Sequence, residues 1–458
     1  MAEAAVFQKS EKFLKMTTAP VEKLILGLAG PSITIMIISA LYNMTDTYFV
    51  ATLGTSQVAA VGIAFPLMAV FQAIGFFFGV GSGNYISRTL GAQNTEAASR
   101  MAVTALVSGF FFMSLVALTG LIGLGPLVNL LRATETIKPH AMEYIYFILL
   151  ASPWMVAATI LNQQLRFQGS AAIAMVGMVS GAILNIFLDF LFIIVFGLGV
   201  RGAAIATMLC QMTSFFILFF YGTTRKGTIR ITFSHFSPAF SRYWEMFRGG
   251  VPSLLRQGLM SLSTVIIYHF AKPYGDAAIA AISIVQRLCM FAFSAVLGFG
   301  QGFQPVCGFN YGAKLYSRVK RSFWFCIRFC SIGLLIICLA MIIFAPQIIA
   351  LFRKDDLEVI AIGARGLRFN CTSLPFMVIV VICNMMTQTM GRALEASILA
   401  TTRQGLFLIP CLFVLGPLLG LLGIQLCTMV ADMASLIVAI PILIRVLKSI
   451  SLPDGEPR

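Results

Sequence analysis

Charged residues are scarce in this chain of 458 residues. They make up 11% of the sequence, against 59% hydrophobic residues, and the mean hydropathy is +0.92. Soluble domains are typically about 25% charged, because charges cover their surface. A soluble enzyme, a disordered chain and a secreted disulfide scaffold are therefore excluded. We predict a multi-pass protein of the inner (plasma) membrane.

Several motifs are missing as well. The chain has no GxxxxGKS or GxxxxGKT sequence, so nothing supports ATP-driven transport. The ten cysteines lack the spacing of metal ligands and nine follow position 288, inside apolar runs, where they are expected to pack as small residues. We expect no enzyme and no cofactor. The first 20 residues have no continuous apolar segment and no A-x-A site, so no cleaved signal peptide is expected.

Apolar runs of about 20 residues, long enough to cross a bilayer, are frequent. We expect twelve transmembrane helices in an all-α protein, near 25–49, 57–83, 102–124, 143–165, 172–196, 202–221, 249–271, 277–303, 322–345, 366–390, 404–422 and 424–447. The long polar segment between the sixth and seventh runs is the natural linker between two lobes. The predicted organisation is a cytoplasmic lead-in 1–23, an N-lobe 24–221, a cytoplasmic linker 222–248, a C-lobe 249–447 and a tail 448–458.

The basic residues are unevenly distributed between the segments that separate these runs. The chain holds 32 Lys and Arg against 17 Asp and Glu, a net charge of +15. Most of the basic residues fall in the alternate segments that begin with the N-terminus. By the positive-inside rule, both termini are cytoplasmic. The positive charge is thus a topology signal, and we expect contacts with the lipid bilayer and none with nucleic acid.

The two halves of the sequence repeat each other. A shift of 221 residues aligns Pro31 with Pro252, Gly54 with Gly275, and residues 91–92 with 312–313. Nearly the same shift aligns Gly169 with Gly391 and Gly202 with Gly423. Because six spans make one copy, both copies have the same orientation in the membrane, as parallel repeats do. We expect two six-helix lobes suited to alternating access.

Only three acidic residues lie well inside apolar runs: Asp46, Asp189 and Asp432. A carboxylate at that depth is costly unless it is paired, protonated or solvated, so each is a functional candidate. Tyr42 and Asn43 precede Asp46 by four and three residues, and Asn185 precedes Asp189 by four, so each set shares a helical face. Such a set could hold a proton or surround Na⁺ with oxygen atoms, and packing through local hydrogen bonds is the alternative.

Several segments carry a family resemblance. DTYFVATLGTSQVAAVGIAFPL, SRTLGAQNTEAASR, GAILNIFLDFLFI, TTRQGLFLIP and ADMAS resemble sequences of the multidrug and toxic compound extrusion (MATE) family, in particular its bacterial multidrug branch. The match covers most of the chain and includes the duplicated six-span plan. The major facilitator alternative predicts a D-R-x-G-R type of loop after the second span, where this sequence reads GNYISRTLGAQN.

The resemblance implies which residues couple ion and substrate movement. Family members with an N-lobe ion site use a first-span Asp preceded by Tyr, a fifth-span Asn-x-x-x-Asp and a sixth-span Thr. The matching residues here are Asp46, Tyr42, Asn185, Asp189 and Thr207. Pro31 matches the proline at which the first span bends.

The resemblance also indicates what the C-lobe lacks. The acidic residues that other members place on spans 7 and 10 are replaced here by Arg256, Gln257, Asn384 and Gln388. Coupling through the N-lobe is therefore favoured. Further candidates for contact with substrate or for the lobe face are Asn43, Met44, Arg256, Gln257, Met290, Phe291 and Asp432. For Asp432 a packing role is as well supported, and Arg256 is either a lobe-face cation or a residue that extends to the membrane interface.

These observations predict a secondary active antiporter. It would export small amphipathic, often cationic, organic compounds in exchange for H⁺ or Na⁺, and act as a monomer. The alternative is a lipid or lipid-linked-saccharide flippase of the same superfamily, which would need a cationic lumen and is disfavoured by the few Lys and Arg expected within spans. A channel or receptor without coupling is the third class.

Overall fold

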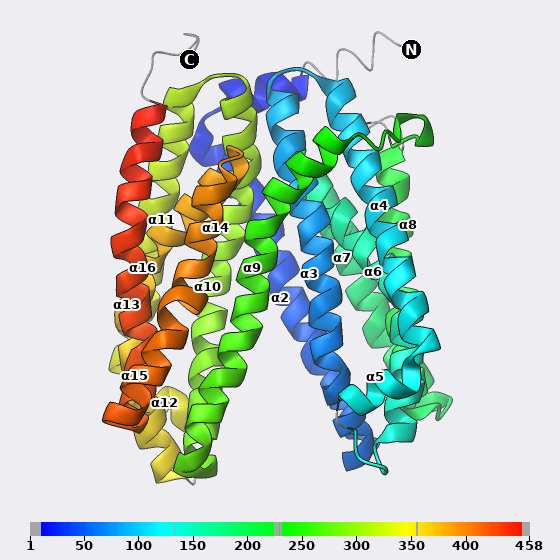
Figure 1. Ribbon diagram of the computed structural model, residues 1–458, viewed down its shortest axis with the longest axis vertical. Coiled ribbons are helices and arrows are strands. Elements are labelled where there is room, and N and C mark those ends of the chain that lie inside the picture. Colours follow the sequence, from blue (N-terminus) through cyan, green and yellow to red (C-terminus); the bar gives the residue numbers. More distant parts are fainter. Residues whose placement is uncertain (1–10, 132, 224–228, 230, 354–355, 451–458) are drawn as a thin grey trace. The chain divides into compact units, whose positions relative to one another are not determined.

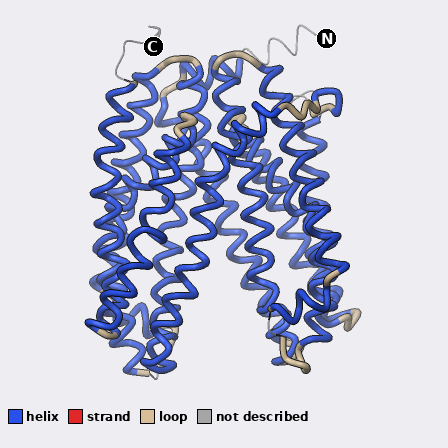
Figure 2. The backbone as a smooth tube through the Cα atoms, in the orientation of Figure 1, coloured by secondary structure: helices blue, strands red, loops and turns tan. Residues whose placement is uncertain are grey.

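The computed structural model describes residues 11–131, 133–223, 229, 231–353 and 356–450. All the regular structure among them is helical (Figures 1 and 2). The long helices are α2 (Val21–Ala51), α3 (Thr55–Gly91), α4 (Thr95–Ile122), α6 (Lys138–Phe167), α7 (Ala171–Asp189), α8 (Gly199–Thr223), α9 (Phe240–Ala271), α10 (Gly275–Gly312), α11 (Tyr316–Ile343), α13 (Leu357–Thr389), α14 (Ala393–Thr401), α15 (Ile409–Leu419) and α16 (Leu421–Ser449). The short ones are α5 (Leu124–Leu130), α12 (Ala345–Ala350), the π-helices η1 (Phe190–Val195) and η4 (Thr402–Leu408), and the 3-10 helices η2 (Phe233–His235) and η3 (Lys272–Tyr274).

The helices confirm the expected membrane-spanning architecture. Eleven stretches of the described chain are long and apolar enough to cross a bilayer, and one of them, Phe240–Gly312, contains both α9 and α10. The chain therefore has twelve spans. The fifth consists of α7 and η1, and the eleventh of α14, η4 and α15, so a π-helical segment lies within each.

Contacts group the chain into two compact units, which we call the N-lobe and the C-lobe. The N-lobe contains residues 34–250 and the segment before residue 19, and the C-lobe contains residues 19–33 and those from 251 onward. This differs from the lobe boundaries expected from the sequence, 24–221 and 249–447. Helix α2 contributes its first part to the C-lobe, and α9 contributes residues 240–250 to the N-lobe.

Glycines explain these two contributions of helix α2 and helix α9. A Cβ atom on Gly81 of α3 would lie 2.4 Å from the carbonyl oxygen of Met246 in α9, and a Cβ on Gly302 of α10 would lie 2.7 Å from the backbone nitrogen of Ala29 in α2. Only glycine permits backbones to approach this closely. Gly81 and Gly302 are aligned by the shift of 221 residues, so both lobes use the same contact.

Each lobe is built around one buried helix, α6 in the N-lobe and α13 in the C-lobe. Helix α6 packs against α3, α4 and α8, and α13 packs against α10, α11 and α16. The repeat extends to hydrogen bonds: the Asn162 side-chain amide donates to the carbonyl of Ala174, and that of Asn384 to the carbonyl of Ala396. The two turns after α3 and α10 agree as well, since Gln93 and Lys314 both have φ near +60°. The predicted internal repeat is confirmed.

Candidate functional site

Helix α2 carries the first buried carboxylate of the N-lobe. Asp46 lies in the part of α2 that belongs to the N-lobe, and Tyr42 lies one helical turn earlier. One carboxylate oxygen of Asp46, Oδ1, is buried and has no hydrogen-bond partner among the described residues. Asn43 and Met44 are on the same helix, but their side chains lie outside the described part of the structure.

Helix α7 carries the second. Asn185 and Asp189 lie one turn apart at the end of α7, just before the π-helical segment η1, and are only 3% and 1% exposed. Asn185 Oδ1 and both carboxylate oxygens of Asp189 are also buried without a partner in the described chain. A buried oxygen that accepts no hydrogen bond is costly, so four such atoms on three side chains indicate a site for a bound proton or cation.

These side chains belong to one cluster. The carboxylates of Asp46 and Asp189 lie close enough to interact electrostatically. The phenol groups of Tyr42 and of Tyr144 in α6 interact with both carboxylates, and the Cys210 thiol in α8 interacts with Asp189 and Asn185. The structure thus brings together residues from four helices, α2, α6, α7 and α8.

Tyr144 and Cys210 are cluster members that the sequence did not reveal. Tyr144 is 2% exposed, so its hydroxyl is held in the interior of the N-lobe. A signal existed for Cys210, because it is the only cysteine before position 289, yet it was interpreted as a packing residue. The expected ligand Thr207 is half-buried on α8, one turn before Cys210, and makes no hydrogen bond within the described chain. Its role stays a prediction.

The chemistry of the cluster is that of hard oxygen ligands. It contains two carboxylates, one amide oxygen and two phenols, without any lysine, arginine or histidine among the members named above. The described residues include no group of three His, Cys, Asp or Glu side chains that would hold a transition metal. Oxygen ligands of this kind suit H⁺ or an alkali cation.

Pro31 lies near the point at which α2 leaves the C-lobe. The contact groups change between residues 33 and 34 in α2 and between 250 and 251 in α9, close to the aligned Pro252. Proline removes one hydrogen bond from a helix and weakens it locally. Each of these two helices therefore has its weak point near the residue at which it passes from one lobe to the other.

The expected C-lobe residues on α9 and α13 form a hydrogen-bonded group without an acid. The guanidinium group of Arg256 donates to Asn384 Oδ1 across a long 3.4 Å, and the Gln388 amide donates to the Ser253 hydroxyl at 2.8 Å. The backbone carbonyl of Gln257 accepts a hydrogen bond from Ser261. No printed contact joins Arg256 to a carboxylate within the described chain.

Asp432 has partners that sequence reasoning did not find. Arg403 Nε lies 2.7 Å from Asp432 Oδ1, and the Ser373 hydroxyl donates to Oδ2, also at 2.7 Å. The neighbouring Ser435 instead donates to the carbonyl of Ala431. Arg403 was counted with a cytoplasmic segment because the eleventh span was expected to begin at 404. That placement was wrong: the span begins in α14, and Arg403 lies inside it, in η4.

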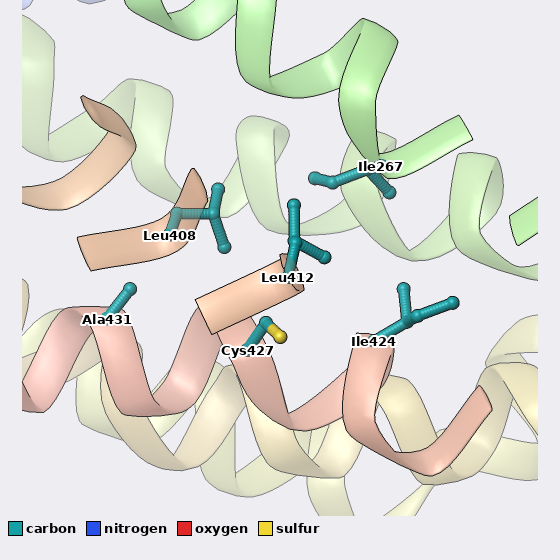
Figure 3. Packing of buried hydrophobic residues seen from close by; sticks show 6 residues of the cluster. All are labelled: Ile267, Leu408, Leu412, Ile424, Cys427 and Ala431. Carbon is teal, nitrogen blue, oxygen red and sulfur yellow. The ribbon is translucent and has the colours of Figure 1, made fainter. Parts of the chain in front are cut away.

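Apolar side chains fill the C-lobe position that matches the aspartate cluster. The residues are Ile267, Leu408, Leu412, Ile424, Cys427 and Ala431, shown in Figure 3. The shift of 221 aligns Ile267 with Asp46, and the shift of 222 that aligns Gly169 with Gly391 places Cys411, which packs against this group, on Asp189. Met290 and Phe291 on α10 are 69% and 68% exposed and stay candidates for substrate contact.

Comparison with known proteins settles the family. A family model described as MatE matches residues 31–191 and 252–414, one segment in each half. The chain belongs to the MATE family. The multidrug export protein MepA of Staphylococcus saprophyticus is 27% identical over 430 residues, which cover 93% of this chain and 94% of the relative. MepA of Staphylococcus aureus strain MSSA476 is 27% identical over 427 residues, with 93% and 94% covered.

Solved MATE structures are similar over nearly the whole chain. A crystal structure of MATE in complex with MaL6 has a TM-score of 0.89 at 27% identity, and covers 95% of this chain and 98% of that one. An outward-facing multidrug resistance MATE transporter of the MOP superfamily has a TM-score of 0.88 at 27% identity, with the same coverage. A MOP superfamily transporter from Pyrococcus furiosus, whose title reports a binding pocket of reverse polarity, has a TM-score of 0.88 at 28% identity, with 96% and 99% covered.

Proposed function

We propose that this MATE-family chain is a secondary antiporter that exports small amphipathic organic compounds in exchange for H⁺ or Na⁺. Family membership and relatives named as multidrug export proteins support the export of drugs. The two-lobe repeat suits alternating access, in which a substrate site opens to one side of the membrane at a time. We further propose that the protein is a monomer of the plasma membrane with both termini in the cytoplasm.

One observation carries the proposed coupling site: four buried, unpartnered oxygen atoms on Asp46, Asn185 and Asp189. A proton or Na⁺ bound there would neutralise charge and satisfy these atoms. Bound ion would therefore favour conformations in which the cluster is closed, and its release would favour those in which the cluster is hydrated. A ligand shifts such an equilibrium by its difference in affinity for the two states.

Helix α2 provides the proposed connection from ion to substrate. Asp46 and Tyr42 lie on the part of α2 after the weak point at Pro31. A change in the packing of Asp46 would bend or straighten that part relative to residues 21–33. The substrate would then lose affinity in the ion-bound state and leave, and the ion gradient would drive export.

The test is dye transport by the purified protein in proteoliposomes. Uphill export of a fluorescent organic cation under an imposed pH gradient, with and without Na⁺, identifies the ion. Asp46→Asn should reduce export to the level of empty vesicles, because an amide cannot carry the negative charge that binds the ion. Asp276→Asn, the same substitution at an exposed residue in the first turn of α10, should leave export unchanged. Full export by Asp46→Asn would refute the coupling site.

A flippase remains the second candidate, and Arg256 is the observation that favours it. This residue lies inside the C-lobe between α9 and α13, and its described partner is an amide rather than an acid. A guanidinium group in this situation suits a phosphate or carboxylate of the cargo. Translocation of a fluorescent lipid-linked phosphate in vesicles that show no dye export would support the flippase over the drug antiporter.

A further inference from the structure

A groove on the C-lobe surface combines arginines with aromatic side chains within a membrane span. It is lined by Glu22 of α2 and by six residues of α11: Arg321, Trp324, Phe325, Arg328, Phe329 and Ile332. Residues 321, 325, 328 and 332 lie on one face of α11, since their spacing follows the helical repeat. Nothing in the proposed transport mechanism uses this groove.

The two arginines of the groove differ in their partners. Arg321 Nε lies 2.8 Å from Glu22 Oε1, so this pair is neutral. Arg328 is exposed and forms no ion pair with a described carboxylate. It was counted with a cytoplasmic segment by the sequence, but lies within the span Tyr316–Ile343. Seven residues separate it from Arg321, so it lies about 10 Å further along the helix.

An exposed arginine at this depth requires an anion or water in the surrounding bilayer. Arginine is unfavourable in hydrocarbon, and its side chain extends toward the interface, where lipid phosphates lie. Trp324, which is 43% exposed, lies between Arg321 and Arg328 on the chain, and tryptophan prefers the headgroup region. These residues mark the level at which headgroups meet acyl chains.

The groove continues as an apolar surface beyond Arg328. Phe329 and Ile332 are 44% and 60% exposed. The Phe329 ring packs on Phe325 and on Phe299 of α10, with centroids 5.7 and 4.9 Å apart, which fixes it in place. A free phosphate ion would leave this surface uncovered, whereas a lipid would cover it with an acyl chain.

We propose that this groove is a binding site for an anionic phospholipid, with the phosphate at Arg328 and Arg321 and an acyl chain along Phe329 and Ile332. Because Glu22 is occupied by Arg321, the site has one uncompensated positive charge. It therefore selects a lipid of net negative charge, such as phosphatidylglycerol, over a zwitterionic one. Basic grooves at the headgroup level commonly bind anionic lipids. This inference is independent of the transport activity.

Native mass spectrometry of the full-length protein in detergent tests the site. Phosphatidylglycerol should bind more tightly than phosphatidylcholine, and Arg328→Gln should weaken phosphatidylglycerol binding by about fivefold. The matched control is Arg445→Gln, an exposed arginine near the end of α16 outside the groove, which should change the affinity by less than about twofold. Equal affinity of wild type and Arg328→Gln, or of the two lipids, would overturn the proposal.

Two further measurements keep the result clear. Glycerol phosphate, which has the anion but no acyl chain, should not compete with the lipid; full competition would mean a site for free phosphate instead. If Arg328→Gln fails to fold, wild-type protein can be cross-linked with phosphatidylglycerol that carries a photoreactive diazirine on its acyl chain. Cross-links on residues 321–332 of α11 are expected, and their absence from this segment contradicts the site.

Discussion

The two lobes place opposite chemistry at the same position of the repeat. In the N-lobe, Asp46 and Asp189 meet with unpartnered oxygen atoms, whereas the aligned C-lobe residues Ile267 and Cys411 belong to a well-packed apolar cluster (Figure 3). Both lobes nevertheless form the same six-span bundle. The C-lobe therefore demonstrates that the helix contacts at this position do not need polar groups. The carboxylates of the N-lobe serve something other than the fold.

The C-lobe contains a buried aspartate too, but satisfies it completely. Asp432 accepts hydrogen bonds from Arg403 and Ser373 on both carboxylate oxygens. The Arg403 guanidinium also lies 5.7 Å from the centroid of the Phe293 ring. A carboxylate that is already paired has little need of a proton or cation. The comparison thus separates a candidate ion site from a buried ion pair.

The largest effect is expected when the two aligned positions are changed separately. Asp189→Asn should reduce gradient-driven export to background, because it removes a charge from the proposed ion site. Cys411→Ala, its counterpart in the C-lobe, should retain most of the export. Initial rates of dye transport in proteoliposomes, at matched amounts of folded protein, measure both. Equal loss in the two variants would remove the functional distinction between the lobes.

A carboxylate placed in the apolar cluster should destabilise the C-lobe strongly. Ile267→Asp introduces an acid at the position of Asp46 without any of its neighbours, at a cost of about 4 to 7 kcal/mol. Ile267→Val should cost only about 1 kcal/mol. Thermal unfolding in detergent compares the two variants. A stable Ile267→Asp protein would mean that the apolar cluster tolerates the polar chemistry of the N-lobe.

The ion pair of the C-lobe should matter for stability more than for coupling. Asp432→Asn leaves Arg403 without its counter-charge and should cost about 3 kcal/mol, the lower end for a buried pair, because Arg403 is partly exposed. Adding Arg403→Gln should recover part of that loss. A double-mutant cycle of unfolding free energies measures the coupling. Loss of gradient-driven export in Asp432→Asn at full stability would instead assign Asp432 a role in transport.

The smallest effect concerns the segments that precede the first helix of each half. Residues 11–18 form a helix on the N-lobe, where the Lys12 ammonium donates to the Ser170 hydroxyl, whereas the aligned segment before α9 holds only the short η2. Burial lowers the pKa of Lys12 to about 8, and the charge of Lys15 acts in the same direction.

This shift in the pKa of Lys12 predicts the sign of a pH dependence. Below pH 8 the amine is protonated whether or not the segment is docked, and the cost of burying its charge is fully present. Between about pH 8 and 10.5 only the undocked amine keeps its proton, so docking strengthens as the pH rises. Tryptic cleavage after Lys15, relative to a peptide of the same sequence, should slow over this range. Lys12→Met should abolish the trend, and an unchanged trend would contradict the assignment.

The sequence predicted the main features of the fold because they follow from local and repeated patterns. Hydropathy identified twelve spans, and the alignment of Gly81 with Gly302 correctly indicated two equivalent lobes. It failed at Arg403, since the polar start of the eleventh span resembles a loop. The reason is physical: Asp432 neutralises Arg403 from another helix, which allows the arginine to lie inside the span.

The candidate site divides in the same way. Asp46, Asn185 and Asp189 could be selected from the sequence, because intramembrane polar residues are rare and costly. Tyr144 and Cys210 could not, since they come from α6 and α8 and only their approach to Asp189 gives them meaning.

By itself, the sequence determined the membrane as solvent, the number of spans, the repeat and the few buried acids, because each depends on how polarity is distributed along the chain. The tertiary structure decided which of those acids are paired. It also decided that residues 19–33 pack in the C-lobe and residues 240–250 in the N-lobe. Pairing and packing depend on distances between helices, and side chains far apart in the chain set those distances.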